Sequence, residues 1–308
     1  MKNKPVVVLN YPFDPRVIAI ELAPFAKVII ASRPEKLRKA LRGADAFVSL
    51  LSTPVNAALL SDAPKLKVVS NFAVGIDNID FKACKERGIR VCNTPRVLTR
   101  STAELTLTLL LAVARRVPEG ELLCRKGNFL GWAPDLLLGL ELKGRRAVIV
   151  GKGRIGSEVA RLFRGLGLKI DFITRSDSPS AVHSKLKSAQ VLSLHIPYKK
   201  ENYHWLNSKR ISHLPRDAIV LNTARGPLID EKALIRALKN RNIFGAGLDV
   251  FEREPRIPTA LRKLKNVVLL PHLGSATYET REAMARAAIT GAIKILGGKR
   301  PWNEVRFS

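Results

Sequence analysis

The sequence is poor in acidic, aromatic and sulfur-containing residues, and it has no long apolar run. Its 308 residues include 26 acidic and 53 basic side chains, 6% aromatics, three cysteines and two methionines. The longest apolar stretch, around Leu105 to Val113, is interrupted by threonines and is shorter than the roughly 20 apolar residues of a membrane-spanning helix. The apolar residues after Met1 to Lys4 are too few for a secretory signal. We therefore expect a cytoplasmic protein that does not enter a membrane.

The three cysteines, Cys84, Cys92 and Cys124, are an odd number and lack the close spacing of metal ligands. An odd count leaves at least one thiol without a disulfide partner in the chain. We expect buried free thiols and no metal site.

The shortage of acidic residues leaves a formal net charge of +27, which favours encounter with anionic molecules. The excess is spread along the chain, because residues 1–100 carry 17 basic and 8 acidic residues and the remainder has nearly the same density. No basic tail, repeat or low-complexity tract concentrates it. A nucleic-acid-binding protein is therefore an alternative that rests on charge alone, and no nucleic-acid-binding motif supports it.

What the sequence does contain is a regular alternation of short apolar runs with helical segments, the pattern of parallel sheets covered by helices. We predict an α/β protein with two doubly wound parallel-sheet domains, a flavodoxin-like substrate domain and a Rossmann dinucleotide domain. The predicted strands are 6–9, 28–31, 47–51 and 68–72 in the first domain, and 147–150, 169–174, 191–194, 218–221, 243–248 and 267–270 in the second.

The predicted substrate-binding domain consists of residues 1–97 and 278–308, and the predicted dinucleotide-binding domain of residues 98–277. Ser101 and Glu104 have the S-x-x-E spacing of a capping box, which predicts that a long helix begins there. The last helix, about Glu279 to Leu296, is expected to return the chain to the first domain.

A glycine-rich loop follows the strand at 147–150 and runs directly into a helix. Gly151, Gly153 and Gly156 form the G-x-G-x-x-G pattern in the strand–turn–helix context that a dinucleotide-binding loop requires. The first glycine permits the tight turn, the second lets the backbone approach a pyrophosphate, and the third lets the helix pack on the strand. The N–H groups at the start of the helix would bind the phosphates.

The residues at the end of the next strand predict the choice of cofactor. An acid there would accept hydrogen bonds from the ribose hydroxyls of NAD, but this chain has Thr174 followed by Arg175. Asp171 lies in the middle of the strand, where we expect it not to reach the ribose. A hydroxyl and a guanidinium suit the 2′-phosphate of NADP better. We expect NADP, with NAD as the alternative.

Three consecutive strands of the second domain are followed by polar residues of different chemistry. Arg225 follows the first, Asp249 and Glu254 the second, and His272 the third. Because ligands of open α/β sheets bind at the carboxyl ends of the strands, we expect these side chains to face one crevice. Reduction of a ketone needs a cation that holds a carboxylate and polarises the carbonyl, and an acid that protonates the oxygen. The strand ends therefore predict an oxidoreductase that acts on a small 2-oxo acid.

These motifs, in this order and spacing, resemble those of the D-isomer-specific 2-hydroxyacid dehydrogenases over essentially the whole chain. Within the family the resemblance is strongest to the glyoxylate/hydroxypyruvate reductases. The segments that carry it are NFAVGIDNID (71–80), NTP (93–95), VLT (97–99), TAE (102–104), GWAP (131–134), GKGRIG (151–156), HIP (195–197), NTARG (222–226), DVFEREP (249–255) and HLGSAT (272–277).

The resemblance implies a role for each of these residues. Arg225 would bind the substrate carboxylate and carbonyl, His272 would be the acid/base, and Glu254 its partner. Backbone N–H groups of Val74 and Gly75 would also hold the substrate carboxylate. Family members are generally homodimers, so we expect a homodimer. Together with the glycine loop and the strand end described above, the residues predicted to bind the cofactor are Thr102, Gly151, Gly153, Arg154, Ile155, Gly156, Thr174, Arg175, His195, Ile196, Pro197, Thr223, Asp249 and Gly274.

Two alternatives stay open at this point. One is another dehydrogenase of the same family, acting on D-lactate, phosphoglycerate or phosphite, although Val74 before Gly75 speaks against phosphite because a lysine is expected there. The other is a non-catalytic dinucleotide-sensing protein of the corepressor type. The sequence does not predict the size of the substrate side chain or the direction of the reaction.

Overall fold

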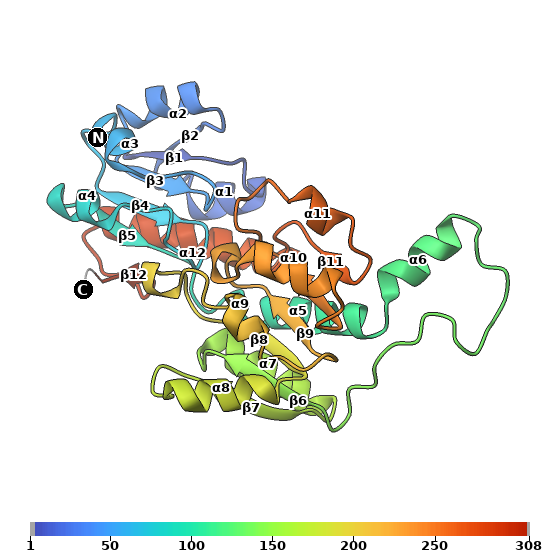
Figure 1. Cartoon of the computed structure of the whole chain (residues 1–308). Coiled ribbons are helices and arrows are strands. Elements are labelled where there is room, and N and C mark those ends of the chain that lie inside the picture. The colour runs from blue at the N-terminus through green and yellow to red at the C-terminus, as the bar shows by residue number, and fades with distance from the viewer. Residues whose placement is uncertain (1–3, 307–308) are drawn as a thin grey trace. The chain divides into compact units, whose positions relative to one another are not determined.

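The computed structural model describes residues 4–306, and the chain divides into two compact units (Figure 1). The first unit consists of Met1–Leu98 with Ala276–Ser308, and the second of Thr99–Ser275. These limits lie within two residues of those expected from the sequence. No helix of the described part of the chain is long and apolar enough to cross a membrane.

Buried apolar runs form the six-stranded sheet of the first unit. Five parallel strands have the order β5-β4-β3-β1-β2, and β12 pairs antiparallel with β5 at the edge. The strands β3 and β4 are buried along their whole length, as expected where helices cover both faces of a parallel sheet. The order of the parallel strands is that of the flavodoxin-like fold. The strands are β1 (Val6–Leu9), β2 (Lys27–Ile30), β3 (Ala46–Ser49), β4 (Val68–Asn71), β5 (Arg90–Cys92) and β12 (Glu304–Val305).

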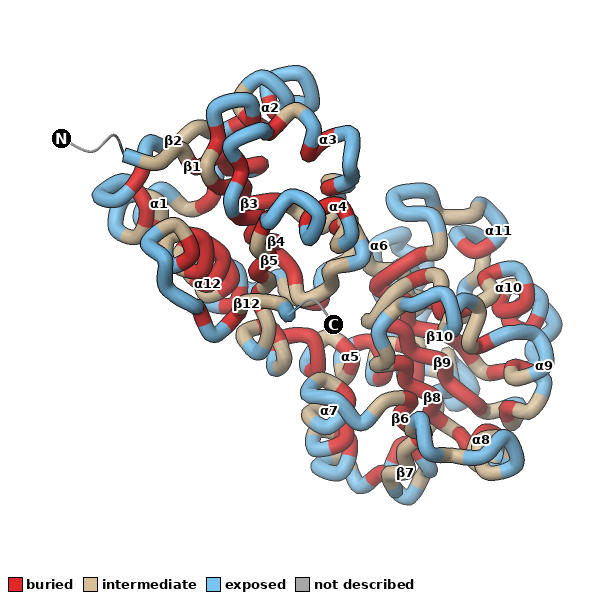
Figure 2. The backbone as a smooth tube through the Cα atoms, turned by 90° about the vertical axis from the view of Figure 1, so that its left-hand side faces the viewer, coloured by how far each residue is buried: buried red, intermediate tan, exposed pale blue. Residues whose placement is uncertain are grey.

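Helices cover both faces of this sheet. On one face, α2 (Pro34–Leu41), α3 (Ala57–Ser61) and α4 (Phe81–Glu86) supply apolar side chains to the core. On the other face, α1 (Pro15–Glu21) packs against α12 (Tyr278–Leu296), which contacts β3, β4 and β5. Figure 2 shows β3, β4 and much of α12 as buried.

The second unit contains another six-stranded sheet, and all of its strands are parallel. Their order is β7-β6-β8-β9-β10-β11, so the winding reverses at β6. Together the two sheets confirm the predicted fold class of two doubly wound α/β domains. The strands are β6 (Arg146–Val150), β7 (Lys169–Ile173), β8 (Val191–Leu194), β9 (Ile219–Asn222), β10 (Gly245–Leu248) and β11 (Val267–Leu269).

The helices of the second unit also form two layers. α5 (Thr99–Ala114) and α7 (Arg154–Gly165) pack against each other and on one face of the sheet. The other face is covered by α8, α9, α10 and α11. Their bounds are α8 (Pro179–Lys187), α9 (Ser208–Ile211), α10 (Glu231–Lys239) and α11 (Thr259–Arg262), and two short 3-10 turns are η1 (Lys200–Asn202) and η2 (Gly226–Leu228).

Two expectations from the sequence were wrong in detail. Ser101 is not a helix cap, because α5 begins at Thr99 and Ser101 is buried inside the helix. Cys84 and Cys92 are buried free thiols as expected, but Cys124 is exposed. It lies on α6 (Val117–Arg125), a helix that buries none of its residues.

Candidate active site

The predicted phosphate-binding loop follows β6, at the point where the winding of the sheet reverses. Gly151 has φ 101°, and a Cβ there would lie 2.6 Å from the carbonyl oxygen of His195. At Gly156 a Cβ would lie 2.1 Å from the carbonyl oxygen of Gly151, so only glycine lets α7 pack this closely. A Cβ on Gly153 would meet nothing within 4 Å. The loop is therefore closely packed on its inner side and open where a pyrophosphate would approach.

The helix that follows this loop offers an anion-binding terminus. Gly153 is the N-cap of α7 and, as a glycine, has no side chain that could accept hydrogen bonds from the first turn. The first N–H groups of a helix lack partners within the helix and carry partial positive charge. Arg154, the first residue of α7, is exposed and adds a cation beside this terminus. The loop and helix together fit the pyrophosphate of a dinucleotide.

The end of β7 contains an acid that the sequence analysis did not single out. Thr174 donates hydrogen bonds from its N–H and its hydroxyl to Oδ2 of Asp177, at 2.7 and 3.0 Å. Asp177 also pairs with Lys185 at 2.5 Å. The hydrogen bond from Lys185, followed by that from the Thr174 backbone, lowers the pKa of Asp177 to about 2. An Asp three residues after Thr174, where it closes a turn with that residue, is the signal that would have identified it.

The other candidate cofactor residue at this strand end is Arg175. It is exposed, and its side chain has no ion pair with any residue in the described range 4–306. Because Lys185 neutralises Asp177, the acid does not present a free charge beside Arg175. The guanidinium of Arg175 is therefore available to bind an anionic group of a ligand.

His195 follows β8, and its ring faces into the protein. Nε2 lies 2.7 Å from the hydroxyl of Ser193, and burial lowers the pKa of His195 to about 3. The ring is neutral at physiological pH. Besides the His195 carbonyl oxygen, Cγ2 of Ile196 lies against Gly151, 2.9 Å from where a Cβ would stand. His195 and Ile196 thus shape the floor of the glycine loop, whereas Pro197 is exposed.

Two of the three predicted catalytic residues are in direct contact. Nδ1 of His272 lies 2.9 Å from Oε2 of Glu254, and each side chain is about a third exposed, 35% and 37%. The other carboxylate oxygen of Glu254 accepts a hydrogen bond from the N–H of Phe251 at 3.1 Å. Since Nδ1 is bound to Glu254, Nε2 is the ring nitrogen that can meet a substrate.

The charges of this group act on one another. Burial by itself would raise the pKa of Glu254, but the hydrogen bond from His272 and the charges of His272 and Arg225 outweigh it, and the pKa lies below its ordinary value. Arg225 is therefore close enough to act on the pair. Its turn is held by Asn222, whose amide donates to the Arg225 carbonyl oxygen at 2.9 Å and accepts from the N–H of Ala224 at 3.0 Å.

Asp249 is fully buried and holds the turn that carries His272. Its two carboxylate oxygens accept hydrogen bonds from the N–H groups of Leu273 and Gly274, at 2.6 and 2.8 Å. Its carbonyl oxygen accepts from the N–H of His272 at 2.9 Å, and His272 has φ 57°. Burial raises the pKa of Asp249, against the effect of these hydrogen bonds.

Two positioning residues were missed by the sequence analysis. Glu231, a buried residue at the start of α10, accepts a hydrogen bond from the N–H of Glu252 at 2.7 Å. Gly226 lies against the same loop, since a Cβ there would be 1.9 Å from the carbonyl carbon of Phe251. Through these contacts the Arg225 turn and the Glu254 loop are held together. The glycine directly after Arg225 was the available signal.

Threonines of α5 connect this region to the remaining predicted cofactor residues. The hydroxyl of Thr102 donates to the carbonyl oxygen of Gly274 at 3.1 Å. One turn further along the helix, the hydroxyls of Thr106 and Thr223 lie 2.8 Å apart. All four residues are within the second unit, and α5 thus fixes the turns after β9 and β11.

The first unit carries the other predicted substrate-binding residues, in the turn after β4. The carbonyl oxygens of Val74 and Gly75 accept hydrogen bonds from the amides of Asn93 and Asn71, both at 2.8 Å. The carbonyl oxygen of Ala73 accepts from a backbone N–H at 2.9 Å. Within residues 4–306, the N–H groups of Val74 and Gly75 donate to no protein acceptor. Three carbonyls are thus tied down, while two neighbouring N–H groups stay available to an anion.

The fold and these sites define a class of protein. An open glycine loop at the reversal point of a parallel sheet fits a nicotinamide dinucleotide. A histidine–carboxylate pair beside an arginine at neighbouring strand ends fits acid/base chemistry on a small acid. The class is that of the nicotinamide-dependent oxidoreductases.

Comparison with known proteins gives the family. The family model "D-isomer specific 2-hydroxyacid dehydrogenase, NAD binding domain" matches residues 107–274. A glyoxylate reductase of Thermococcus litoralis is 45% identical over 283 residues, which cover 87% of this chain and 86% of the relative. The crystal structure of the TT0316 protein from Thermus thermophilus has a TM-score of 0.93 at 40% identity, covering 98% of this chain and 100% of that one.

A further solved structure is that of an NADPH-dependent glyoxylate/hydroxypyruvate reductase from Sinorhizobium meliloti, in complex with NADP and malonate. Its TM-score is 0.88 at 30% identity, covering 98% of this chain and 97% of that one. The chain belongs to the D-isomer-specific 2-hydroxyacid dehydrogenases, and the resemblance seen in the sequence is confirmed. It is an NAD(P)-dependent dehydrogenase that interconverts a small 2-oxo acid and a D-2-hydroxy acid.

Proposed function

We propose that this protein is a glyoxylate/hydroxypyruvate reductase that prefers NADPH. The observation that carries the proposal is the contact of 2.9 Å between His272 and Glu254, beside Arg225. Relatives such as that of Thermococcus litoralis bear the name glyoxylate reductase. The Sinorhizobium meliloti structure holds malonate, a small carboxylic acid. Both support a small 2-oxo acid as the substrate.

Each of the three side chains has its own task in the reduction. Arg225 binds the substrate carboxylate and polarises the carbonyl. His272 delivers a proton from Nε2 to the carbonyl oxygen as negative charge develops there. Glu254 holds Nδ1 and thereby the orientation and tautomer of the ring. The bound dinucleotide supplies the hydride.

We propose that the turn after β4 provides further anion-binding groups for the substrate. The N–H groups of Val74 and Gly75 would donate to the carboxylate, which is supported by their lack of a protein acceptor within residues 4–306. Paired backbone N–H groups of this kind form concave sites for anions.

The preference for NADPH rests on the end of β7. Arg175 is exposed without an ion pair in the described residues, and Thr174 offers a hydroxyl beside it. Asp177 is the only acid in this turn, residues 174–178, and Lys185 neutralises it. A 2′-phosphate would therefore meet a net positive strand end.

The experiment is a rate measurement by loss of reduced-nicotinamide absorbance. We expect turnover of glyoxylate and hydroxypyruvate that exceeds turnover of pyruvate and 3-phosphohydroxypyruvate, with NADPH preferred over NADH. Preference for pyruvate or 3-phosphohydroxypyruvate would favour a D-lactate or phosphoglycerate dehydrogenase. Dinucleotide binding without turnover of any of the four would favour the sensing protein.

A pair of substitutions tests the cofactor preference. Thr174→Asp with Arg175→Ala replaces the cation by an acid that can accept from the ribose hydroxyls. We expect the ratio of kcat/KM for NADPH over NADH to fall by roughly a hundredfold, since a charged hydrogen bond of about 1.5–3 kcal/mol is lost. An unchanged ratio would show that the phosphate is read elsewhere.

We propose a homodimer, and the segment between α6 and β6 supports it. Figure 1 shows α6 and this segment projecting away from the sheet of the second unit. The segment carries several large apolar side chains in solvent, with Leu130 98% and Trp132 83% exposed. Apolar side chains gathered in this way mark protein–protein interfaces. Light scattering is expected to give twice the mass of the chain, and a monomer would contradict the proposal.

We also propose a cytoplasmic location, which the thiols support. All three cysteines are free, as is usual in a reducing compartment. Burial raises the pKa of Cys84 to about 11 and that of Cys92 to about 12, so both are unreactive. Imaging of a tagged chain in its own cells tests this.

A further inference from the structure

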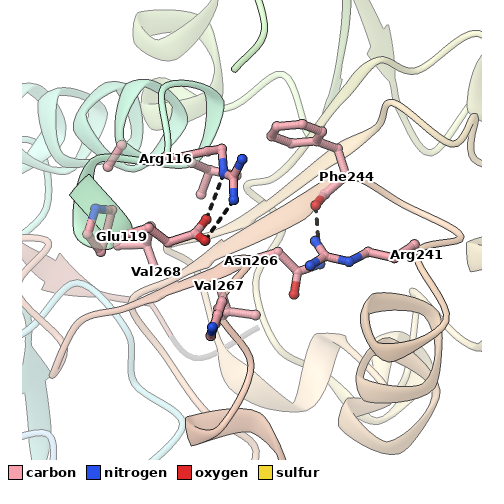
Figure 3. A pocket seen from close by; sticks show the side chains of 11 residues that line it. Arg116, Glu119, Arg241, Phe244, Asn266, Val267 and Val268 are labelled. Atoms are coloured by element: carbon pink, nitrogen blue, oxygen red, sulfur yellow. Dashed lines mark hydrogen bonds and ion pairs between the residues drawn. The ribbon is translucent and has the colours of Figure 1, made fainter. Parts of the chain in front are cut away.

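A hollow in the second unit lies at the edge of the sheet where β10 and β11 begin (Figure 3). Its volume is about 200 Å³. The lining comes from three separate segments: the end of α5 with the start of α6, the turn after α10, and the residues leading into β11. The catalytic residues follow the opposite, carboxyl ends of the strands. The hollow is therefore distinct from the active site, and we call it the basic hollow.

The charged residues of the basic hollow are three cations and one carboxylate. Arg116 pairs with Glu119 through two hydrogen bonds of 2.9 Å. The side chains of Arg241 and Lys265 form no ion pair or hydrogen bond with any other residue of the range 4–306. Figure 3 shows Arg116 with Glu119 on one side and Arg241 on the other. Two positive charges are therefore left without a counter-charge.

The two unpaired cations lie close enough to Glu119 for their charges to act on it. The hydrogen bond from Arg116 is the main reason that the pKa of Glu119 is lowered, and the charges of Arg241 and Lys265 lower it further against the effect of burial. Both carboxylate oxygens of Glu119 accept a hydrogen bond from Arg116. An additional ligand would thus meet two free cations and a carboxylate that is already neutralised.

The backbone beneath these side chains is fixed. The amide of Asn266 donates to the carbonyl oxygens of Leu238 and Phe244, at 3.3 and 3.2 Å, and ties the α10 turn to the start of β11. Arg116 and Arg241 have left-handed backbone conformations, with φ 53° and 56°. Such conformations are uncommon for non-glycine residues and place each arginine at a corner of the chain. Arg116, Arg241 and Lys265 thus line one hollow, and the backbone that carries them has a defined conformation before any ligand arrives.

We propose that the basic hollow binds a dianion of phosphate size, held by Arg241 and Lys265. A dianion balances the two uncompensated charges, whereas a monoanion such as a 2-oxo monocarboxylate balances one. The guanidinium fork of arginine matches phosphate oxygens, and lysine adds a mobile point charge. The volume lies below the roughly 300 Å³ where pockets for larger organic ligands begin, which excludes a dinucleotide. Binding of a dianion would give two of the chain's many basic residues, Arg241 and Lys265, a specific function.

The test is calorimetric titration of the full chain with inorganic phosphate at pH 8, with the dinucleotide site saturated by whichever of NADH or NADPH binds. Arg241→Ala with Lys265→Ala is expected to weaken phosphate binding roughly tenfold or more. Both side chains are exposed, so the variant should fold, and its reductase activity should equal that of the wild type.

The matched control is Arg146→Ala with Lys169→Ala. These two residues are also exposed, remove the same charges, and are neighbours at the same edge of the sheet, on β6 and β7. Phosphate affinity of this control is expected to stay within about twofold of the wild type. Equal losses in both pairs would show that phosphate responds only to the diffuse charge, and would overturn the proposal.

Two further outcomes would also overturn it. One is the absence of phosphate binding to the wild type, or unchanged binding to the Arg241 and Lys265 variant. The other is succinate binding at least as tightly as phosphate, which would reject phosphate as the chemistry recognised. Weak or absent succinate binding supports the proposal.

Discussion

The two units have similar orders of parallel strands, but the polar residues at the carboxyl ends of these strands differ in kind. In the first unit they are amides and hydroxyls that bond to one another: Asn71 bonds to Asn78 at 2.9 Å, and Ser49 donates to Asn71 at 2.9 Å. In the second unit they include ionisable, partly exposed groups such as His272 and Glu254. The same architecture thus supports a neutral, closed network in one unit and a chargeable, open one in the other.

The difference suggests different roles: the polar residues of the first unit stabilise a turn, and those of the second unit can transfer a proton. Neutral amide networks fix a turn without depending on pH, and beside the Asn71 network the N–H groups of Val74 and Gly75 have no protein acceptor among residues 4–306. Proton transfer needs a group that titrates near neutrality, and all five histidines of the chain lie between residues 99 and 275. Substitutions of the polar strand-end residues in the second unit should therefore lower kcat, and such substitutions in the first unit should raise KM.

The largest effect is expected from His272→Ala. Removing the acid/base should lower kcat by about 10²–10⁴-fold, the usual contribution of general acid catalysis, while the Kd of the dinucleotide stays within about twofold. Steady-state kinetics and fluorescence titration measure the two quantities. His213→Ala, a change of the same kind outside the site, is the control and should leave both unchanged. Retained turnover in the His272 variant would remove the acid/base assignment.

A smaller effect concerns stability in acid, and it also belongs to the second unit. Burial holds the pKa of His195 at about 3, below the value of about 6.5 in an unfolded chain. As the pH falls below about 6.5, the His195 imidazole is protonated in the unfolded state but stays neutral in the folded state. The contribution of His195 to the free energy of unfolding is therefore fully present above this pH. It falls by about 1.4 kcal/mol per pH unit as the pH is lowered toward 3.

Urea unfolding between pH 7 and pH 5 measures this loss. The wild type should lose about 2 kcal/mol more than His195→Gln over that range, because the variant has no imidazole to protonate. Parallel pH curves for the two proteins would show that the His195 ring is not buried in its neutral form.

The smallest effect is expected in the first unit, from Asn71→Ala. The variant loses the hydrogen bond that holds the Gly75 carbonyl oxygen, so the turn after β4 should loosen. We expect KM for the 2-oxo acid to rise roughly tenfold, the equivalent of about 1.4 kcal/mol, with kcat within about threefold. Steady-state kinetics at saturating dinucleotide measures both.

The control for this change is Ser70→Ala, at the preceding position of β4. Ser70 donates its hydroxyl to the carbonyl oxygen of Ala288 at 2.7 Å, away from the turn. Each variant should lose about 1–2 kcal/mol of stability, but Ser70→Ala should leave KM unchanged. A similar rise of KM in both variants would mean that KM reports only general destabilisation.

Most of the fold could be predicted because short apolar runs that alternate with helical segments report the buried strands of a parallel sheet. The strand β5 was missed since Arg90-Val91-Cys92 has only two apolar residues in a row, and β12 is two residues long. Both depend on a partner far away in the sequence: Arg90 pairs with Glu304 at 2.7 Å. The capping box at Ser101 failed because α5 begins two residues earlier, at Thr99, which places Ser101 inside the helix.

The sequence by itself determined the class of the protein. The glycine loop is a local pattern, since strand, turn and helix follow one another in the chain, and its backbone demands leave few residue choices at Gly151 and Gly156. The types of residue at the strand ends are likewise local, because each strand carries its own polar residue at its carboxyl end. These patterns were enough to indicate an oxidoreductase that acts on a small 2-oxo acid, and the order and spacing of the wider set of motifs added the resemblance to the D-2-hydroxyacid dehydrogenase family.

Only the tertiary structure decided how distant segments meet. Three features each join separate elements of the chain. They are the ion pair of Asp177 with Lys185, the hydrogen bond from the Glu252 N–H to Glu231, and the cations that line the basic hollow. Sequence periodicity reports which face of an element is buried, but not which charged side chain of another element lies opposite. That choice is made when the helices and strands pack, and charge balance can be judged only afterwards.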